Sequence, residues 1–532
     1  MSEGPPIIEC MFDKGLPPAA RLAQEQDAAV VAAIAGWARI EAQAAARRLQ
    51  AIAELVHRRC ATVERADWAC DEWDAAAAEV SAALGISHGR ASGQMYEAMG
   101  LRERLPELAA RFAAGNVSAR VVTAIAWRTY LVTDPAALAS IDTTIAEHAS
   151  RWNALSQYKL DQAIDAVVDQ HDPGALRRNR AGVRGRDVSF GGRNPETGTT
   201  SLWGRLLGAD AAVLERRLTR MAHAVCDDDP RTVGQRRADA LGALGAGSDH
   251  LACQCGNPQC PAAGKERGPD PRAGAVVIHV LADADALTAE PDPLMSGEAP
   301  RHASRPITRD TPLAEALAPD SEPEPEPQPR HCAGRAAIAG GPAIPTPLLA
   351  QLIADGAAVR HLDPPAHQVE PGYRPSAALQ EFVRMRDLTC RFPNCDVPAD
   401  RCDVDHAIPW PFGPTHPSNL RCLCRKNHLL KTFWAGDGGW SDRQDPNGAI
   451  TWTSPTGQTY TTEPGSRLLF PSWNIDTGPL PSTPNRPVNA EHRGAMMPVR
   501  RRTRAAERQR RIALERAHND AHIAERNMPP PF

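Results

Sequence analysis

Four residues in the last third of the chain have the types that phosphodiester hydrolysis requires. This reaction needs a nucleophilic water, a group that takes its proton, and a cation that neutralises charge on the phosphoryl and leaving oxygens. A histidine suits proton transfer near neutral pH, and a carboxylate with a neutral imidazole suits a divalent cation. Asp405, His406, Asn419 and His428 supply these types within one short stretch. They are the candidate catalytic and metal-binding residues.

The local sequence predicts the elements that carry these residues. Asp405 and His406 end a β-branched segment, CDVDHAI, which we expect to be a strand. Asn419 lies in a Pro-Ser-Asn turn, and residues 420–433 have a helical composition that places His428 on a helix. Because adjacent strand residues point to opposite faces, Asp405 and His406 can serve one site only if the strand bends or ends there. The expected order of strand, turn, strand and helix is the ββα-metal arrangement.

Residues 390–431 resemble an HNH endonuclease domain, because Asp-His, Asn-Leu and a late Cys with His-x-x-Lys occur there in order. The whole chain is similar to the actinobacterial repeat-family HNH endonucleases. These combine a helical N-terminal domain of unknown function, a CxCGxxxCP stretch and a C-terminal HNH nuclease domain. The similarity covers residues 20–285 and 335–470. It implies an enzyme, a metal-dependent endonuclease that hydrolyses DNA phosphodiester bonds, with DNA as the partner.

The resemblance also implies a role for each candidate residue. His406 would be the general base that deprotonates water, and Asp405 with His428 would hold the catalytic divalent ion. Such ligands could take magnesium, manganese or zinc. Asn419 would tie the connecting loop to the strand and so hold His406 in place.

Three basic residues on the same segment are candidate nucleic-acid contacts. Lys431, Arg421 and Arg425 lie near enough in the predicted helix to contact phosphates. The alternative interpretation of all three is ordinary surface charge.

A structural zinc site is the second implication of the resemblance. In relatives, the counterparts of Cys390 and Cys395 pair with a later CxxC or CxxH, but the later half here is CRKN. Cys424 therefore matches, whereas Asn427 stands where a cysteine or histidine is expected. Because structural zinc is four-coordinate and Asn is a poor ligand, another residue would have to complete the site. The alternatives for that position are Cys402, His416 and Cys422.

A second functional hypothesis follows from this departure at Asn427. The chain could be a non-catalytic DNA-binding or regulatory protein whose HNH-like fold binds zinc without cutting DNA. The complete set of candidate catalytic residues opposes this alternative, because only a zinc position departs from the motif.

Composition indicates a multidomain protein without a membrane segment. A length of 532 residues fits roughly two to four domains, and 48 prolines indicate substantial linker. The start of the chain lacks a basic segment followed by an apolar core, and no apolar run is long enough to span a bilayer. Most of the 13 cysteines lie in two clusters, which favours metal or reduced thiols in a cytoplasmic protein over disulfides. The sequence specifies no oligomeric state.

The expected fold is mainly α, beginning with a helical domain at residues 18–170. Its tryptophans, Trp37, Trp68, Trp73, Trp127 and Trp152, are expected to anchor the helix packing. Within it, residues 79–98 have a Gly85 turn followed by a Ser87 cap. This pattern fits either a DNA-reading helix-turn-helix or an ordinary helical hairpin.

The remaining organisation follows from composition and spacing. We predict a small α+β unit at 187–285, a disordered Pro/Glu-rich linker at 286–335, a helix with the HNH domain and a β-hairpin at 340–470, and a disordered or helical basic tail at 475–532. Cys253, Cys255 and Cys260 could share a metal within the α+β unit, and His250 is the nearest candidate for a fourth ligand. The arginines of the tail either form a solvated arm or neutralise phosphates.

Overall fold

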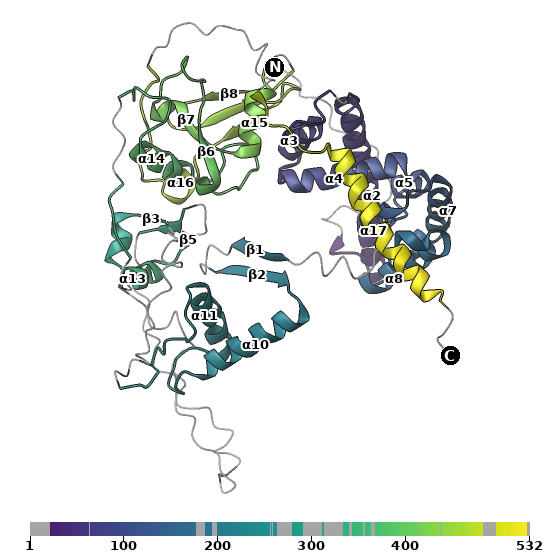
Figure 1. Cartoon of the computed structure of the whole chain (residues 1–532), viewed down its shortest axis with the longest axis horizontal. Helices are drawn as coiled ribbons and strands as arrows, with labels where there is room; N and C mark the ends of the chain where they lie inside the picture. Colours follow the sequence, from purple (N-terminus) through teal and green to yellow (C-terminus); the bar gives the residue numbers. More distant parts are fainter. Residues whose placement is uncertain are drawn as a thin grey trace.

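The computed structural model describes residues 22–62, 64–176, 187–193, 199–255, 257, 259–262, 279–290, 311–312, 334–339, 343–354, 357–362, 368–436, 438–481 and 496–528. Its folded parts are mainly helical with small sheets, which confirms the predicted mainly α class. In Figure 1 the N-terminal helices pack into one domain, and the strands that follow residue 400 belong to a second unit beside it. Within the described ranges, no helix combines the length and apolarity needed to cross a bilayer.

Seven helices build the N-terminal domain, and alanine with aliphatic residues fills its core. Fully buried residues such as Met95, Phe112 and Ile125 lie in one core with the buried alanines of the long helix α2. Side-chain caps begin several of the helices; the Asp71 carboxylate, for example, accepts a hydrogen bond from Asp74 N. The helices are α2 (Asp27–Arg59), α3 (Glu72–Leu84), α4 (His88–Glu103), α5 (Pro106–Ala113), α6 (Ala119–Arg128), α7 (Pro135–Trp152) and α8 (Gln157–His171).

The tryptophan prediction is only partly right. Trp152 is buried and Trp68 and Trp73 are half-buried, but Trp37 and Trp127 are 43% and 61% exposed. Alanine-rich helices can approach each other closely, so aliphatic side chains fill the space between them and these two indoles remain outside.

Residues 79–98 form two helices joined by a tight turn. Gly85 ends α3 in the left-handed conformation at φ +65, and the Ser87 hydroxyl caps α4. The α4 helix is engaged on two sides: at its start His88 contacts Lys426 of the C-terminal unit, and further along Tyr96 stacks under Arg508. These contacts favour the helical hairpin over a helix free to enter a DNA groove.

A small α+β unit follows the helical domain. The strands β1 (Asp187–Arg193) and β2 (Thr200–Arg205) form an antiparallel hairpin, and the helices α10 (Gly208–His223) and α11 (Val233–Gly245) come next. The two helices enclose a core of four buried residues, Met221, Val225, Ala240 and Leu251.

The predicted boundaries at residues 285 and 335 separate strands that the structure joins. The strand β3 (Val280–Ala282) pairs with β4 (Ala336–Ile338), which pairs in turn with β5 (Ala343–Ile344). The helix α13 (Thr346–Ala354) packs on this sheet. Because a strand of three residues needs partners for stability, β3 belongs with the chain beyond the linker. Most of residues 286–335, and residues 263–278 of the predicted α+β unit, lie outside the described residues.

Within its described residues, the C-terminal unit contains two small sheets and three α-helices. The order β6–β7 forms one antiparallel sheet and β10–β9–β8 the other, so the predicted hairpin has a third strand. Three residues of the helical domain, Cys70, Ala78 and Ala82, pack in the same core as this unit. The elements are α14 (Ala377–Asp387), β6 (Cys402–His406), β7 (Leu420–Cys424), α15 (Arg425–Phe433), β8 (Ser441–Gln444), β9 (Ile450–Thr453), β10 (Thr459–Thr462) and α16 (Gly465–Leu469).

A buried ion network connects three elements of this unit. The Asp387 carboxylate accepts hydrogen bonds from Arg386 Nε at 2.8 Å, Arg391 Nη1 at 3.1 Å and the backbone N of Cys422 at 2.8 Å. All three side chains in the ion network are almost completely buried. Burial alone would raise the pKa of Asp387, but the two guanidinium groups outweigh it and lower that pKa.

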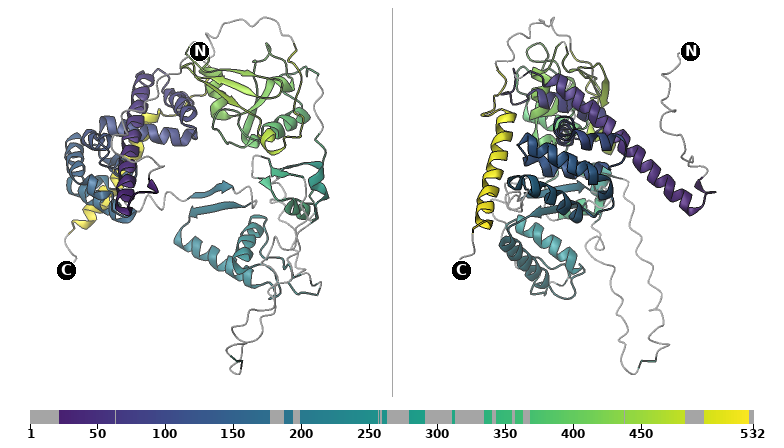
Figure 2. Two further views of the ribbon diagram at one scale, coloured as in Figure 1. Left: turned by 180° about the vertical axis from the view of Figure 1, so that it is seen from behind. Right: turned by 90° about the vertical axis from the view of Figure 1, so that its right-hand side faces the viewer.

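The predicted tail contains a docked helix rather than a solvated arm. The helix α17 (Arg504–Arg526) runs along the N-terminal domain (Figures 1 and 2). Arg504 pairs with Asp71 at 3.0 Å and Asp74 at 2.8 Å, and Arg516 pairs with Asp172 at 2.7 Å. The helix therefore docks largely through ion pairs, a signal that a search for an apolar stripe does not detect.

Candidate functional site

The candidate catalytic residues lie where β6, β7 and α15 meet. The strands pair from Cys402 opposite Cys424 to His406 opposite Leu420. The predicted helix 420–433 begins only at Arg425, because its first five residues form β7. The strand β6 ends at His406, as a shared site for Asp405 and His406 requires.

His428 and Asp405 approach each other across this junction. The Nε2 atom of His428 lies 3.3 Å from Oδ1 of Asp405, and its Nδ1 lies 2.8 Å from Oδ2 of Asp403. Burial alone would lower the pKa of His428, but the two carboxylates raise it. A carboxylate on the second ring nitrogen is the usual way to orient a metal-binding histidine. Asp403 was not among the predicted site residues, although it alternates with Asp405 on the same strand.

Lys431 occupies the other side of the Asp405 carboxylate. Its Nζ lies 2.6 Å from Oδ2 of Asp405 and also donates to the backbone carbonyl of His406. Burial alone would raise the pKa of Asp405, but Lys431, with help from His428 and Arg421, lowers it. Burial in turn lowers the pKa of Lys431. Asp405 is therefore an ionised carboxylate with a cation already beside it.

Hydrogen bonds fix the tautomer of His406. The Thr415 hydroxyl donates its proton to the Gly372 carbonyl at 2.6 Å and lies 2.9 Å from His406 Nε2. Because that hydroxyl can only accept from the imidazole, Nε2 carries the proton and Nδ1 keeps the lone pair. Tyr373 stacks on the ring with centroids 5.4 Å apart. Burial lowers the pKa of His406, which favours the neutral ring.

Asn419 ties the loop between β6 and β7 together. Its Oδ1 accepts from Ile408 N at 2.8 Å, and its Nδ2 donates to the carbonyls of Ile408 and Pro414. The side chain is completely buried. These bonds brace the loop that immediately follows His406, the positioning role expected from the sequence.

Two of the three predicted phosphate contacts are buried instead. Arg421 has no exposed side-chain surface; it pairs with Asp442 at 2.5 Å and lies over the Trp452 ring. Lys431 is 9% exposed and points to Asp405. Both predictions are wrong in placing these groups on the surface, because β7 and α15 turn them inward. Arg425 has a side chain 64% exposed, 3.4 Å from Asp403.

Three thiols form the predicted structural zinc site. The Sγ atoms of Cys390, Cys395 and Cys424 all lie within 4.8 Å of one another. Asn427 contributes the fourth side chain, with Nδ2 3.4 Å from Cys390 Sγ. Burial alone would raise the pKa of Cys390, but hydrogen bonds from its thiol neighbours and Asn427 hold it well below the usual range. The donor set fits zinc through three sulfurs.

Of the three alternative fourth ligands, Cys402 lies beside the cluster, because its thiol forms a hydrogen bond with the thiol of Cys390, although it is not one of the thiols that all lie within 4.8 Å of one another. Cys402 Sγ lies 3.3 Å from the Pro398 carbonyl, and Cys422 Sγ lies against Val383. His416 Nδ1 accepts a hydrogen bond from Ser418 N at 3.2 Å. Asn427 and Cys402 are therefore the two further side chains that contact Cys390.

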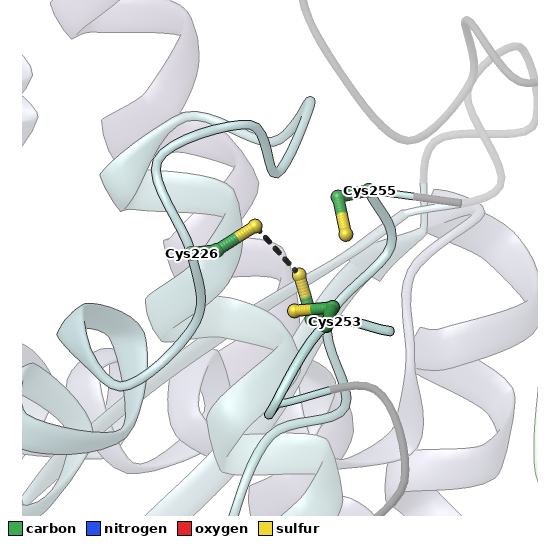
Figure 3. A group of neighbouring side chains, drawn as sticks. Cys226, Cys253 and Cys255 are labelled. Atoms are coloured by element: carbon green, nitrogen blue, oxygen red, sulfur yellow. Dashed lines mark hydrogen bonds between the residues drawn. The ribbon is translucent and has the colours of Figure 1, made fainter. Parts of the chain in front are cut away.

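A second cysteine cluster has a member that sequence reasoning missed. Cys226, three residues after α10, lies beside Cys253 and Cys255 (Figure 3), and Cys260 completes this group of four. The predicted candidate His250 instead contacts its neighbours, with Nδ1 3.2 Å from Asp249. The signal available in the sequence was a fourth cysteine within the same predicted α+β unit.

The helical domain contacts α15, the helix that carries His428. Trp434 Nε1 donates to the Cys70 carbonyl at 2.9 Å, and Lys426 Nζ lies 3.5 Å from Asp74. The start of α15 thus contacts α3, and its end contacts the residue Cys70 just before α3.

The comparisons with known proteins identify relatives without an assigned activity. The chain is 58% identical over 526 residues to the uncharacterized protein Rv2100 of Mycobacterium tuberculosis strain H37Rv, covering 99% of this chain and 94% of the relative. It is 53% identical over 523 residues to the uncharacterized protein Rv3776 of the same strain, covering 98% and 95%. No solved structure matches. Residues 37–324 match the family described as "Domain of unknown function (DUF222)", and the chain belongs to that family.

Proposed function

We propose that this chain is a metal-dependent HNH endonuclease that hydrolyses DNA phosphodiester bonds at the junction of β6, β7 and α15. One observation carries the proposal. His428 Nε2 lies 3.3 Å from Asp405 Oδ1, next in the chain to His406, whose Nε2 is held by Thr415. The Asp405–His428 pair, which suits a divalent ion, therefore lies next to His406, whose Nδ1 lone pair can accept a proton.

The residues present fit a catalytic cation with two protein ligands. Asp405 and His428 would hold it, and Asp403 orients His428 through Nδ1. A divalent ion there would neutralise charge on the phosphoryl and leaving oxygens. Lys431 adds a fixed positive charge beside the same carboxylate.

The chain's own groups would perform the proton transfer and the positioning. His406 accepts the proton of the attacking water at Nδ1, while Thr415 and Tyr373 hold its ring. Asn419 braces the following loop. Arg425, the exposed member of the predicted basic set, is placed to contact a phosphate.

A second candidate function is favoured by the Lys431–Asp405 pair and by Asn427. A lysine 2.6 Å from the carboxylate satisfies its charge without a metal ion, and Asn427 weakens the zinc donor set. The chain would then be a DNA-binding or regulatory protein that retains an HNH-like fold without cutting.

Plasmid cleavage separates the two candidates. Full-length protein would be incubated with supercoiled plasmid and Mg²⁺, Mn²⁺ or Zn²⁺, comparing the parent with His406→Ala and, as a matched control, His57→Ala at the exposed end of α2. Because a positioned general base contributes about 10²–10⁴-fold, His406→Ala should lose at least about 100-fold in rate while the control keeps the parental rate. DNA binding, measured by fluorescence anisotropy, should change little.

Two results would reject the nuclease proposal. One is equal nicking by the parent and His406→Ala; the other is DNA binding without cleavage in every metal, which supports the second candidate. Thr415→Val provides a second test in case His406→Ala misfolds, because it removes only the hydroxyl that orients His406. It should lower the turnover rate, and circular dichroism would verify that both variants keep the parental helix content.

A further inference from the structure

We propose that Cys226, Cys253, Cys255 and Cys260 bind one zinc ion as four thiolates, and that this ion holds together the unit built by α10 and α11. The site lies outside the junction of β6, β7 and α15 and does not depend on the proposed nuclease activity. It lies within the residues that match the family of unknown function. The inference rests on the donor atoms, on the way the chain positions them, and on the size of the surrounding core.

The four sulfurs have the spacing of a tetrahedral zinc site. All four Sγ atoms lie within 4.8 Å of one another, and those of Cys226 and Cys253 are 3.4 Å apart. With zinc–sulfur bonds of about 2.3 Å, tetrahedral geometry separates the sulfurs by about 3.8 Å. A disulfide requires about 2.05 Å, and all four cysteines are free. In Figure 3 the side chains of Cys226 and Cys253 point toward one another from two separate segments.

Local backbone turns bring three of these cysteines together. The backbone N of Cys253 donates to the Ala262 carbonyl at 3.3 Å, which closes the loop that carries the CQC pair and Cys260. Within that loop, Cys260 N donates to the Asn257 carbonyl at 3.0 Å. Such a turn aims the thiols inward before any ion binds. Four soft thiolates at short spacing select zinc over hard cations.

A buried ion pair positions the remaining cysteine. Asp229, three residues after Cys226, accepts from Gln254 N at 3.0 Å, while Arg231 donates to the Ala252 carbonyl at 2.7 Å. Asp229 and Arg231 also pair with each other at 2.7 Å, with nearly no exposed side-chain surface. The segment after α10 is thus fastened to the residues on both sides of Cys253. The backbone turns of the Cys253–Cys260 loop and the Asp229–Arg231 ion pair therefore each help to bring the four sulfurs together.

The surrounding core is too small to fix this loop-rich unit alone. Its buried residues are Met221, Val225, Ala240 and Leu251, and Ala240 buries little apolar area. Ordering the backbone costs conformational entropy for every residue in the connecting loops. Small units with so little apolar core generally use disulfides or metals, and the binding free energy of a structural zinc ion then stabilises the fold. Zinc would therefore dominate the stability of this unit.

Metal analysis of the full-length chain, purified under reducing conditions, tests the proposal. Zinc equivalents would be measured by mass spectrometry in the parent, Cys226→Ser, Cys255→Ser, Cys390→Ser and the control Cys60→Ser, a free cysteine outside both clusters. Cys226→Ser and Cys255→Ser should each lose one equivalent relative to the parent and to Cys60→Ser. Any loss in Cys390→Ser reports on the other cluster, so the two sites are counted separately.

Cobalt substitution reports the number of thiolate ligands. Co²⁺ added to metal-free Cys390→Ser should give the intense visible bands of tetrahedral thiolate coordination, and Cys226→Ser in that background should reduce and shift them. Hydrogen exchange supplies the folding readout: chelation should increase exchange in residues 226–231 and 251–262 while α7 and α8 keep their protection. This restriction distinguishes loss of the site from general misfolding of a variant.

Three results would overturn the proposal. The first is an unchanged zinc content in both Cys226→Ser and Cys255→Ser. The second is iron with sulfide in place of zinc. The third is a Cys226–Cys253 disulfide in the freshly purified protein, detected by thiol titration and peptide mapping.

Discussion

The two cysteine clusters of this chain lie in units with different cores. The Cys226 cluster has four thiols, and the core packed beside it has four buried apolar residues within the described part of that unit. The Cys390 cluster has three thiols and Asn427, and its unit contains a large core that includes Phe392, Trp440 and Trp452. The cluster with the complete donor set thus belongs to the unit with less apolar packing.

This difference indicates how much each unit depends on a metal. In the C-terminal unit, edge-to-face aromatic contacts surround Phe392, with ring centroids 4.9 Å from Trp440 and 5.0 Å from Trp452. The Asp387 network adds buried charged hydrogen bonds between α14 and β7. Such a unit can tolerate an amide at a zinc position. Within its described residues, the unit of α10 and α11 has no apolar core of comparable size. Removing one thiol there should therefore destabilise its unit much more than removing one thiol from the Cys390 cluster.

Asp387→Asn should cause the largest loss of local unfolding free energy in the C-terminal unit. The change leaves two buried arginines facing a neutral amide, and breaking a buried ion network by removing one partner costs about 3–5 kcal/mol. Hydrogen exchange of β7 and β9 would measure the loss of local unfolding free energy. Chelation of zinc from the parent should cost this unit less. If chelation costs more than Asp387→Asn, the metal rather than the charges holds the C-terminal unit, and the contrast between the two units fails.

Acid should weaken the C-terminal unit through the same carboxylate. The pKa of Asp387 is lower in the folded protein than the unfolded value of about 3.9, so its stabilisation is fully present above that value. It is lost as pH falls through the lowered pKa, because the unfolded chain binds the proton first. Near-UV circular dichroism between pH 6 and 2 would follow the transition in chelated protein. Asp387→Asn should give a flatter pH dependence, and parallel curves would show that another carboxyl group dominates.

A smaller effect is expected from Asp229→Asn in the other unit. Asp239 remains 2.9 Å from Arg231 and still neutralises it, so we expect a cost of about 1–3 kcal/mol, typical of an impaired buried hydrogen bond. With zinc bound, the loops stay joined and the variant should keep its full zinc content. Metal content and hydrogen exchange of residues 226–254 would be compared in one preparation. Complete opening of these loops with zinc retained would show that the ion pair, and not the metal, fixes them.

Sequence reasoning located the local elements better than the long-range partners. The Gly85 turn and the Ser87 cap depend on neighbouring residues only, and both occur as expected. The loop-bracing role of Asn419 was implied by the motif, and its hydrogen bonds fit that role. A site shared by Asp405 and His406 requires the strand to bend or end there, and only the folded structure shows that β6 ends at His406.

The missed features depend on residues distant in the chain. Arg421 and Lys431 looked like surface charges, because their buried partners Asp442 and Asp405 are apparent only once the strands pair. The arginines of α17 were expected to lie free, but Asp71, Asp74 and Asp172, more than 300 residues earlier, pair with them. Cys226 was missed for the same reason, since its partners begin 27 positions later. Ionic and thiol partners carry little periodic signal, unlike the apolar faces of helices.

The smallest effect, and the most direct comparison of the clusters, should come from Asn427→Cys. Asn427 is buried with Nδ2 3.4 Å from Cys390 Sγ, so a thiol there would complete a four-sulfur set like that of the Cys226 cluster. We expect the zinc affinity of this site to rise roughly 10- to 100-fold. Changing groups that only hydrogen-bond to metal ligands already alters metal affinity by about that factor, and an added ligand should do at least as much. Competition with a chromophoric chelator in the Cys226→Ser background would isolate the Cys390 site. Because the C-terminal core is already large, the unfolding free energy of metal-free protein should change little. An unchanged affinity would mean that the first turn of α15 holds position 427 too far from the ion, and that Asn427 reflects geometry rather than a lost ligand.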